Sequence, residues 1–267
     1  MSCSESHEDL LVLVINLDDS QERMREADTQ LSDVGIDYTR FSAVDGRGKK
    51  ANAFLGYDEK SANNFYGRRL TGGEVGCFLS HVRCAQAFLK TQAKYCLVLE
   101  DDIQVLPNAK GKLTQLISWL AKNEALEWDL INLRKQPRRF FSVLDKFSSG
   151  NSCTELAKAH YFPVSTAALL WSRPGAQRFA QTQDHVYAPI DHFLRFRLSA
   201  SGRGLITNPP IFGVTGAESV LDNDRKTGPT PNRALRGPAH IWIDFKRQGS
   251  NYLNAIYHLL RHRLFGR

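Results

Sequence analysis

Apolar and polar residues alternate in two distinct periods over the first 46 residues. Residues 10–17 form a nearly continuous apolar run, which is typical of a buried strand. Apolar residues then recur at helical spacing over 24–34, and Asp19 with Glu22 has the spacing of a capping box. Residues 38–44 alternate and predict a second strand. The chain is therefore predicted to open with a strand, a helix and a second strand.

The middle of the chain continues this alternation after an interruption. Residues 47–69 are polar and rich in glycine and asparagine, which predicts a long loop or an irregular insert. Thr71 and Glu74 form a second capping box, and a helix is predicted to follow them. The apolar run 95–99 after this helix has the length of a strand, and its last residue precedes three consecutive acids.

The remaining elements are predicted with the same criteria. Strands are predicted at 128–133 and 166–171, and helices at 113–120 and 190–198. Ser172 and Pro174 are typical of a helix start. Residues 134–159 show weak periodicity and are predicted to be rich in loops. Residues 205–214 form a strand that prolines interrupt, so an edge position is predicted for it.

This order of elements predicts an α/β fold, with a mostly parallel open sheet flanked by helices. The chain has 267 residues, enough for one large domain or two small ones. We predict one folded α/β domain over residues 1–231. Residues 232–267 are predicted to form a basic, amphipathic, helical C-terminal tail.

Charge is distributed unevenly between these two parts. The formal net charge of the chain is +7. Residues 232–267 hold seven Lys or Arg and one acid and so carry +6 of it. The body is nearly neutral, which argues against a nucleic-acid surface and predicts no nucleic-acid partner.

Cysteine usage and the N-terminus bear on the cellular compartment. The five cysteines include no CxxC pair and no zinc spacing, which favours thiols in a reducing compartment. The first apolar run is short and follows acidic residues, unlike a signal peptide or a membrane span. We therefore expect a cytoplasmic protein, located peripherally on the inner face of the cytoplasmic membrane.

Three consecutive acids, Glu100, Asp101 and Asp102, follow the strand predicted at 95–99. In open α/β sheets the carboxyl ends of the strands are where ligands bind. Adjacent carboxylates repel one another unless a cation neutralises them. Hard oxygen ligands suit Mg²⁺ or Mn²⁺, which often bind together with substrate phosphates. The alternative is a solvated acidic loop after a core strand.

Asn16 and Arg23 lie at the end of the first strand and on the first turns of the helix behind it. Helix N-termini favour anions, so a diphosphate could bind there. The alternative is a surface ion pair of Arg23 with Asp19 or Asp45. The chain has no dinucleotide fingerprint and no Walker A motif.

Two further candidates lie on predicted helices. Ser80 and His81 lie one turn after Gly76, whose missing side chain allows a close backbone approach; a lone helix histidine, however, is more often structural. Asp191 is placed in the first turn of the helix predicted at 190–198. It either complements the helix dipole or acts as a general base.

The C-terminal tail combines apolar residues at helical spacing with basic ones. Such a helix resembles an interfacial helix whose apolar face enters the headgroup region of an anionic membrane. The alternative is a terminal helix that packs on the body with solvated arginines. We predict binding to an anionic membrane surface through the tail.

Six motifs in this order resemble glycosyltransferase family 25, which includes lipopolysaccharide and lipooligosaccharide galactosyltransferases and is related to collagen galactosyltransferases. The resemblance covers residues 11–196. The motifs are INLDDSQERM (15–24), FSAVDG (41–46), LTGGEVGCFLSH (70–81), LVLEDD (97–102), STAALLWSRPGAQRF (165–179) and APIDHFL (188–194).

This resemblance implies a GT-A-like fold, a nucleotide-sugar donor and an acidic metal motif. Asp102 and Asp101 are the implied ligands of Mn²⁺ or Mg²⁺, and Asp191 is the implied catalytic base. The predicted donor-binding residues are Asn16, Arg23, Asp45, Ser80, His81, Glu100 and Asp101. The segment 134–159 matches no family motif clearly, and Val164 with Ser165 replaces a turn that often contains glycine.

The predicted function is a metal-dependent, inverting transfer of a hexose, galactose from UDP-galactose, to a sugar hydroxyl of a lipopolysaccharide-type glycan. The acceptor is a glycan or a lipid-linked glycan. Two alternatives stay open. One is a Mg²⁺-dependent phosphotransferase or phosphohydrolase, and the other is a non-catalytic sugar- or membrane-binding protein.

Overall fold

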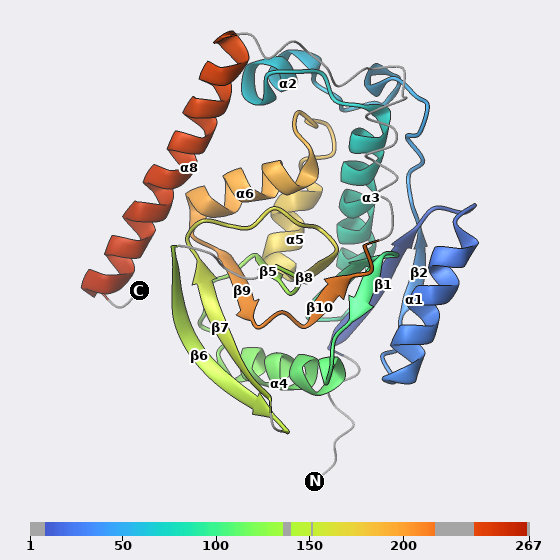
Figure 1. Ribbon diagram of the computed structural model, residues 1–267, viewed down its shortest axis with the longest axis vertical. Coiled ribbons are helices and arrows are strands. Elements are labelled where there is room, and N and C mark those ends of the chain that lie inside the picture. Colours follow the sequence, from blue (N-terminus) through green and yellow to red (C-terminus); the bar gives the residue numbers. More distant parts are fainter. Residues whose placement is uncertain (1–8, 136–139, 151, 217–237, 266–267) are drawn as a thin grey trace.

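A mixed β-sheet with helices on both faces organises the protein (Figure 1). The computed structural model describes residues 9–135, 140–150, 152–216 and 238–265. The elements are, in chain order, β1 (Leu10–Asn16), α1 (Gln21–Asp33), β2 (Thr39–Ser42), the 3₁₀ helix η1 (Ala51–Ala53), α2 (Glu59–Tyr66), α3 (Gly72–Leu89), β3 (Tyr95–Glu100), β4 (Ile103–Val105), α4 (Ala109–Lys122), β5 (Leu130–Asn132), β6 (Phe141–Ser149), β7 (Ser152–Ala159), β8 (Ala168–Ser172), α5 (Arg173–Ala180), α6 (Ile190–Ser201), β9 (Gly204–Asn208), β10 (Phe212–Val214) and α8 (Pro238–Phe265).

The main sheet has eight strands in the order β2-β1-β3-β8-β5-β9-β7-β6. β1 pairs in parallel with β2 and with β3, and β5 pairs in parallel with β9. β8 and β7 run antiparallel to both of their neighbours, so the other strands of this sheet all point the same way. The predicted α/β class and the opening strand–helix–strand unit are confirmed.

Side chains of the central strands alternate between two cores. Leu13 and Ile15 of β1 face the core beneath α3, α5 and α6, whereas Val12 and Val14 face the core beneath α1 and α4. Both faces are therefore covered, which explains why the strand reads as a continuous apolar run rather than as an alternating one.

Two predictions about irregular segments are wrong, and a third is incomplete. The weak periodicity of residues 134–159 predicts loops, but β6 and β7 form a long antiparallel hairpin there. The strand predicted over 205–214 divides into β9 and β10 around a cis peptide bond between Asn208 and Pro209, and β9 lies inside the sheet between β5 and β7, not at an edge. Residues 47–69 hold α2 as well as loop.

Two of the three helix starts that capping residues predict are confirmed. Thr71 and Glu74 form the predicted capping box of α3, and Ser172 caps α5 with a proline in its first turn. The capping box predicted for α1 is wrong. Ser20 takes the N-cap position there without a side-chain cap, because Asp19 instead accepts a hydrogen bond from Arg47 at 2.7 Å.

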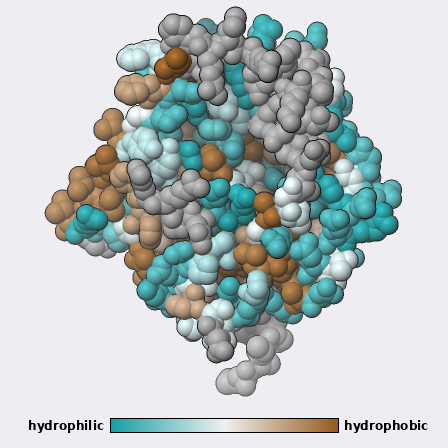
Figure 2. Space-filling model, viewed as in Figure 1, coloured by the Kyte–Doolittle hydropathy of each residue, from teal (hydrophilic) through white to brown (hydrophobic). Residues whose placement is uncertain are grey.

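The predicted helical tail is α8, and it packs on the body along one face. Asn251 and Ala255 are buried, and Tyr252 stacks on Tyr161 with ring centroids 4.8 Å apart. The opposite face exposes large apolar side chains, and Figure 2 shows hydrophobic surface on this side of the molecule. They include Ile241, Trp242, Phe245, Leu253, Tyr257, Leu260, Leu264 and Phe265. The boundary predicted at residue 231 lies outside the described residues.

Among the helices that the structure describes, none has both the length and the apolar composition that a bilayer crossing requires.

Candidate functional site

A pocket opens at the carboxyl ends of β1 and β3, beside the first half of α3. It contains about 710 Å³ of atom-free space, part of it open to solvent. Its walls combine acids, cations and backbone from several segments. They are formed by Ile15, Asn16, Leu17, Arg23, Ala43, Val44, Asp45, Gly46, Arg47, Gly73, Cys77, Ser80, His81, Glu100, Asp101 and Asp102.

The structure brings almost all the predicted site residues into this one pocket. The predicted donor-binding and metal-binding residues all line it, although they come from β1, α1, α3, β3 and the loops after β2 and β3. Asp191 is the exception, because it lies on α6 and is not part of the pocket wall. A pocket of this size at the carboxyl edge of a sheet is typical of a small-ligand site.

Arg23 and Asn16 hold the carboxylate of Asp101. An Arg23 guanidinium nitrogen lies 2.5 Å from Oδ1, and the Asn16 side-chain amide donates to Oδ2 at 2.7 Å. Both carboxylate oxygens of Asp101 are thus engaged. Burial raises the pKa of Asp101, while Arg23 and Asn16 act against that rise.

Asp102 is placed differently from its neighbour. Its Oδ2 lies 3.6 Å from an Arg23 nitrogen, and its Oδ1 is buried with no hydrogen-bond partner in the described part of the chain. Burial and the negative charge of Glu100 raise the pKa of Asp102 to about 6, although Arg23 opposes this. A buried carboxylate oxygen without a partner is costly, so it is a natural position for a cation.

Glu100 pairs with His81 across the pocket wall. The Nε2 atom of His81 lies 3.1 Å from a carboxylate oxygen of Glu100. Burial alone would raise the pKa of Glu100, but the hydrogen bonds from His81 and Thr166 hold it below its usual value. Glu100 is therefore ionised at neutral pH.

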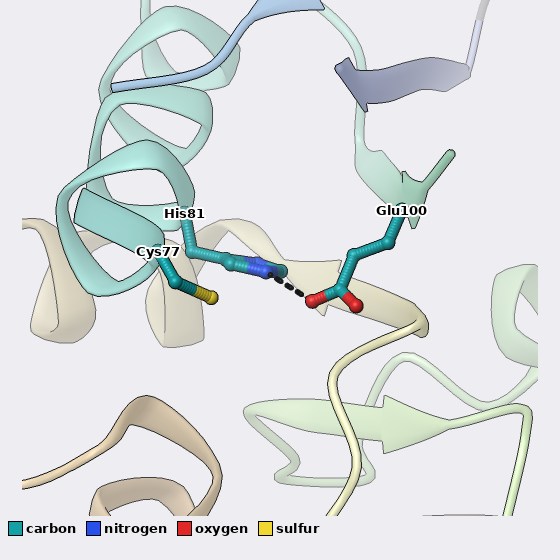
Figure 3. Close-up of side chains that lie close together, drawn as sticks. All are labelled: Cys77, His81 and Glu100. Atoms are coloured by element: carbon teal, nitrogen blue, oxygen red, sulfur yellow. Dashed lines mark hydrogen bonds and ion pairs between the residues drawn. The ribbon is translucent and has the colours of Figure 1, made fainter. Parts of the chain in front are cut away.

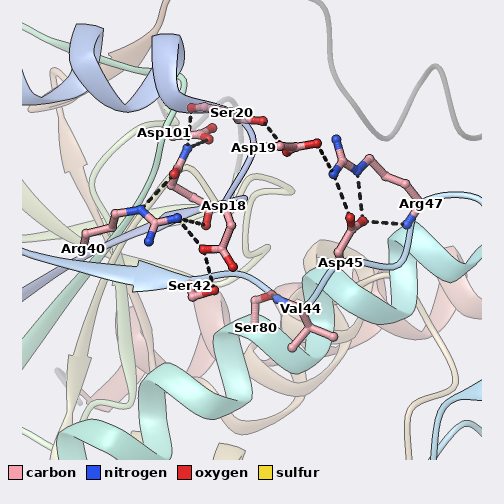
Figure 4. Close-up of polar contacts among 11 residues, drawn as sticks. Asp18, Asp19, Ser20, Arg40, Ser42, Val44, Asp45, Arg47, Ser80 and Asp101 are labelled. Atoms are coloured by element: carbon pink, nitrogen blue, oxygen red, sulfur yellow. Dashed lines mark hydrogen bonds and ion pairs between the residues drawn. The ribbon is translucent and has the colours of Figure 1, made fainter.

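Ser80 has a structural role in the pocket wall. Its hydroxyl accepts from the backbone N–H of Val44 at 2.8 Å (Figure 4). It also donates to the backbone carbonyl of Gly76 at 2.8 Å. A Cβ on Gly76 would lie 2.5 Å from the Val44 carbonyl oxygen, and one on Gly46 would lie 1.9 Å from the carbonyl oxygen of Gly72. Because these positions are glycine, the backbone of α3 can contact the backbone of the loop after β2.

Arg47 forms a second basic group at the rim of the pocket. It contacts Asp45 through two guanidinium nitrogens, at 2.9 and 2.7 Å, and Asp19 at 2.7 Å (Figure 4). This hydrogen bonding lowers the pKa of Asp45 to about 2. The carboxylate predicted to bind the donor is therefore occupied by Arg47.

Asp191 begins α6 some distance along the chain from these groups. Its Oδ1 accepts from the backbone N–H of His192 at 2.8 Å, as an acid in a first helical turn does. Burial raises the pKa of Tyr66, and the charge of Asp191 adds to that rise. The charge of Asp191 thus reaches Tyr66 at the end of α2, and its role as a base stays a prediction.

A hard divalent metal fits the pocket at Asp102 but not at Asp101 in the present arrangement. Asp102 offers a buried oxygen that no described residue satisfies, whereas Arg23 and Asn16 already engage Asp101. Asp101 could become a ligand only if Arg23 moved away from it, for example toward a diphosphate.

Sequence reasoning missed two polar side chains of the pocket, those of Arg47 and Cys77. Arg47 follows Asp45-Gly46 in a segment with the composition of a loop, and no local pattern indicates where its side chain points. Cys77 precedes His81 by four residues, so the two share one face of a helix. That spacing is the signal in the sequence for Cys77.

The sequence model of glycosyltransferase family 25 (LPS biosynthesis protein) matches residues 10–194, which is more than half of the chain. The chain belongs to glycosyltransferase family 25. The match includes every pocket residue and Asp191.

Curated family 25 relatives are longer than this chain. A human protein described as an inactive glycosyltransferase 25 family member 3 is 36% identical over 191 residues, covering 68% of this chain and 31% of that protein. A glycosyltransferase 25 family member of Aedes aegypti is 27% identical, covering 68% and 30%. Mouse procollagen galactosyltransferase 2 is 26% identical, covering 68% and 29%. The family 25 chain thus spans less than a third of these three curated relatives.

One solved structure, a glycosyltransferase involved in the glycosylation of the major capsid of PBCV-1, aligns with a TM-score of 0.41 and 11% identity. The alignment covers 81% of this chain and 97% of that chain. A structural likeness at this TM-score supports no conclusion about the activity of the family 25 chain.

Proposed function

We propose that this family 25 chain is a metal-dependent glycosyltransferase that transfers a hexose from a nucleotide sugar with inversion. The favoured donor is UDP-galactose, and the favoured acceptor is a sugar hydroxyl of a lipopolysaccharide-type, lipid-linked glycan. The observation that supports this most is the buried, unpartnered Oδ1 of Asp102, which no described residue satisfies, beside Arg23 in the pocket. A carboxylate and a guanidinium side by side suit a metal–diphosphate ligand.

Six pocket residues have a role in this proposal. Asp102 would hold Mn²⁺ or Mg²⁺, which would supply positive charge for the departing nucleoside diphosphate. Arg23 and the N-terminus of α1 bind the diphosphate as anion-binding groups. Asn16 keeps Asp101 oriented, and Glu100 with His81 forms the wall beneath the ligand.

The proposed base is Asp191. A base needs only to reach the acceptor hydroxyl, and Asp191 lies outside the wall of the donor pocket, as an acceptor-side group would. The charge of Asp191 acts on the hydroxyl of Tyr66 and on the guanidinium of Arg195, which therefore lie on the same side. The acceptor is thus proposed to bind near the start of α6.

A second candidate is a non-catalytic sugar-binding protein, which the names of relatives favour. The human relative that is 36% identical is described as inactive. A chain of this kind would bind a nucleotide sugar and release no nucleotide. A Mg²⁺-dependent phosphohydrolase, the other alternative, would hydrolyse simple phosphomonoesters without an acceptor.

The decisive experiment is a donor screen that follows nucleotide release from several UDP-sugars in the presence of Mn²⁺ and a glycan acceptor. We expect release from UDP-galactose that stops in EDTA and in Asp102→Asn, but continues in Asp37→Asn, an exposed change of the same charge. UDP binding without release would favour the non-catalytic candidate. Full activity in EDTA would rule out the metal-dependent mechanism.

We also propose that α8 binds an anionic membrane surface, from which a lipid-linked acceptor would be presented. The face of α8 opposite the body exposes 56% of Trp242, 67% of Phe245 and 73% of Leu264. Lys246 lies near the Trp242 ring, and further basic residues follow toward the end of the helix. Exposed apolar side chains flanked by cations are typical of interfacial helices.

A further inference from the structure

We propose that Cys77, His81 and Glu100 form a binding site for a thiophilic divalent cation, with Zn²⁺ as the best-suited ion. Cys77 and His81 project from one face of α3, and Glu100 projects toward them from the end of β3 (Figure 3). One ligand atom of each lies within 4.8 Å of the other two. No other part of the proposed mechanism uses the thiol.

These separations are close to those of a formed zinc site. With ligand distances of about 2.0–2.3 Å, tetrahedral zinc holds its ligand atoms about 3.5 Å apart. The ligand atoms therefore need to approach one another by at most roughly an ångström, which side-chain rotation at Cys77 and Glu100 can supply. His81 and Glu100 already meet at 3.1 Å.

An independent observation distinguishes His81 from a histidine that is satisfied within the core. Its side chain is only 1% exposed, and its Nδ1 is buried with no hydrogen-bond partner among the described residues. A buried imidazole nitrogen without a partner is costly in a purely structural residue. A cation bound at Nδ1 would give this nitrogen the partner that it lacks among the described residues.

The chemistry of the ligands selects the ion. Sulfur, nitrogen and one carboxylate oxygen suit Zn²⁺, whereas Mg²⁺ and Mn²⁺ prefer oxygen ligands such as Asp102. The thiol loses its proton to solvent on binding, so a thiolate, a carboxylate and a neutral imidazole balance the charge of the ion. All three residues line the pocket, which leaves the fourth coordination position facing the ligand space.

The zinc site lies inside the proposed donor pocket. The effect of zinc on donor binding argued here therefore rests on the proposed function. Glu100 is adjacent in sequence to Asp101 and Asp102, so zinc here lies in the same pocket as the nucleotide diphosphate. Its charge and its fourth ligand would compete with donor binding. We therefore infer that Zn²⁺ inhibits the enzyme by occupying the donor pocket.

Metal binding by the full chain tests the site without any assumption about activity. Zn²⁺ titration by calorimetry and Co²⁺ substitution followed by absorption are the two measurements. We expect one equivalent of Zn²⁺ and a thiolate-to-cobalt charge-transfer band. Cys77→Ser should abolish the band and weaken zinc binding by more than the ~10–100-fold that loss of an outer-shell partner costs.

Two matched variants control for other binding. Cys153→Ser removes an exposed thiol on the β6–β7 hairpin and should leave both signals unchanged. Asp102→Asn should retain zinc while losing manganese. If Cys77→Ser affects folding, Glu100→Gln provides a second test and should also weaken zinc binding. Absence of the cobalt band in the wild-type chain, or equal zinc affinity in Cys77→Ser, would overturn the proposal.

A final measurement separates this site from the proposed function. UDP affinity is measured with Mn²⁺ present, with and without Zn²⁺, in the wild-type chain and in Cys77→Ser. Zinc should weaken UDP binding in the wild-type chain only. Zinc binding that leaves UDP affinity unchanged would keep the site and refute the inhibition, whereas a chain that binds zinc but no UDP would refute the proposed function alone.

Discussion

Replacing Asp102 by asparagine should stabilise the metal-free protein. The carboxyl of Asp102 has a pKa of about 6 in the folded chain, against a usual value of 3.8. A carboxyl with a raised pKa contributes stability only when it is protonated. That contribution is complete below about pH 4 and is lost as the pH rises to about 6. At neutral pH the folded chain therefore holds an ionised group in an unfavourable environment.

The size of this penalty follows from the shift. At about 1.36 kcal/mol per pKa unit, a shift of roughly two units corresponds to about 3 kcal/mol. The introduced asparagine would recover part of it, since an amide still needs hydrogen-bond partners and Arg23 keeps its contact with Asp101. We expect the free energy of unfolding at about pH 7.5 to rise by about 1–3 kcal/mol in Asp102→Asn.

The assay is urea unfolding of both chains in EDTA at about pH 7.5 and again at about pH 4.5, on either side of the folded-state pKa. The difference in the free energy of unfolding between Asp102→Asn and the wild type should be smaller at the lower pH, where the wild-type carboxyl is largely protonated. Mn²⁺ should then raise the stability of the wild-type chain and leave that of Asp102→Asn unchanged. The control is Asp37→Asn, whose side chain is exposed, and no change is expected there.

A variant that is less stable than the wild type by more than about 1 kcal/mol would refute this reasoning, because the value exceeds the usual scatter of surface substitutions. The ion pair with Arg23 would then outweigh burial and the repulsion from Glu100. Asp102 would in that case be a structural ion-pair partner rather than a position prepared for a cation.

Three other residues or segments give predictions that separate experiments can check. Asp191→Asn should lower the turnover number by ~10²–10⁴-fold with little change in donor affinity, and a loss well below tenfold would assign Asp191 to helix capping. Burial lowers the pKa of His160 to about 4 from 6.5, so this group's stabilisation is complete above pH 6.5 and is lost as the pH falls to about 4. In urea unfolding, His160→Gln should therefore remove about 3 kcal/mol of this pH dependence of the free energy of unfolding. The full chain should sediment with anionic vesicles at low salt and be released at high salt. The double variant Trp242→Ser and Phe245→Ser should stay in the supernatant at both salt concentrations. The control Leu55→Ser, an exposed change elsewhere, should behave like the wild type.

The pocket is more predictable from sequence than the sheet around it. Parallel strands deliver their following residues to one edge, so Asn16 and Glu100 are expected to meet once each strand is recognised. Segment 134–159 cannot be predicted in the same way. Its hairpin is stabilised by pairing with β9, from a distant part of the sequence, and its own alternation is weak.

Side-chain partners in the pocket are less predictable than positions. The sequence assigns Asp45 to the donor, but Arg47, two residues later, engages it. Ser80 lies where the motif places it, yet both of its hydrogen bonds go to backbone groups. A motif fixes which residues reach a site, whereas the competition among neighbouring charges is decided by distances that only the folded chain provides.

The backbone contact between α3 and the loop after β2 makes one wall of the pocket a fixed template. Where Gly46 meets Gly72 there is no side chain that can change rotamer, so this wall cannot widen or narrow by small substitutions. Alanine at Gly46 would force the helix and the loop apart, which would shift Cys77 and His81 together with α3. Adaptation of the pocket to a different ligand is therefore expected at Arg23 and Arg47, whose long side chains are held by ion pairs.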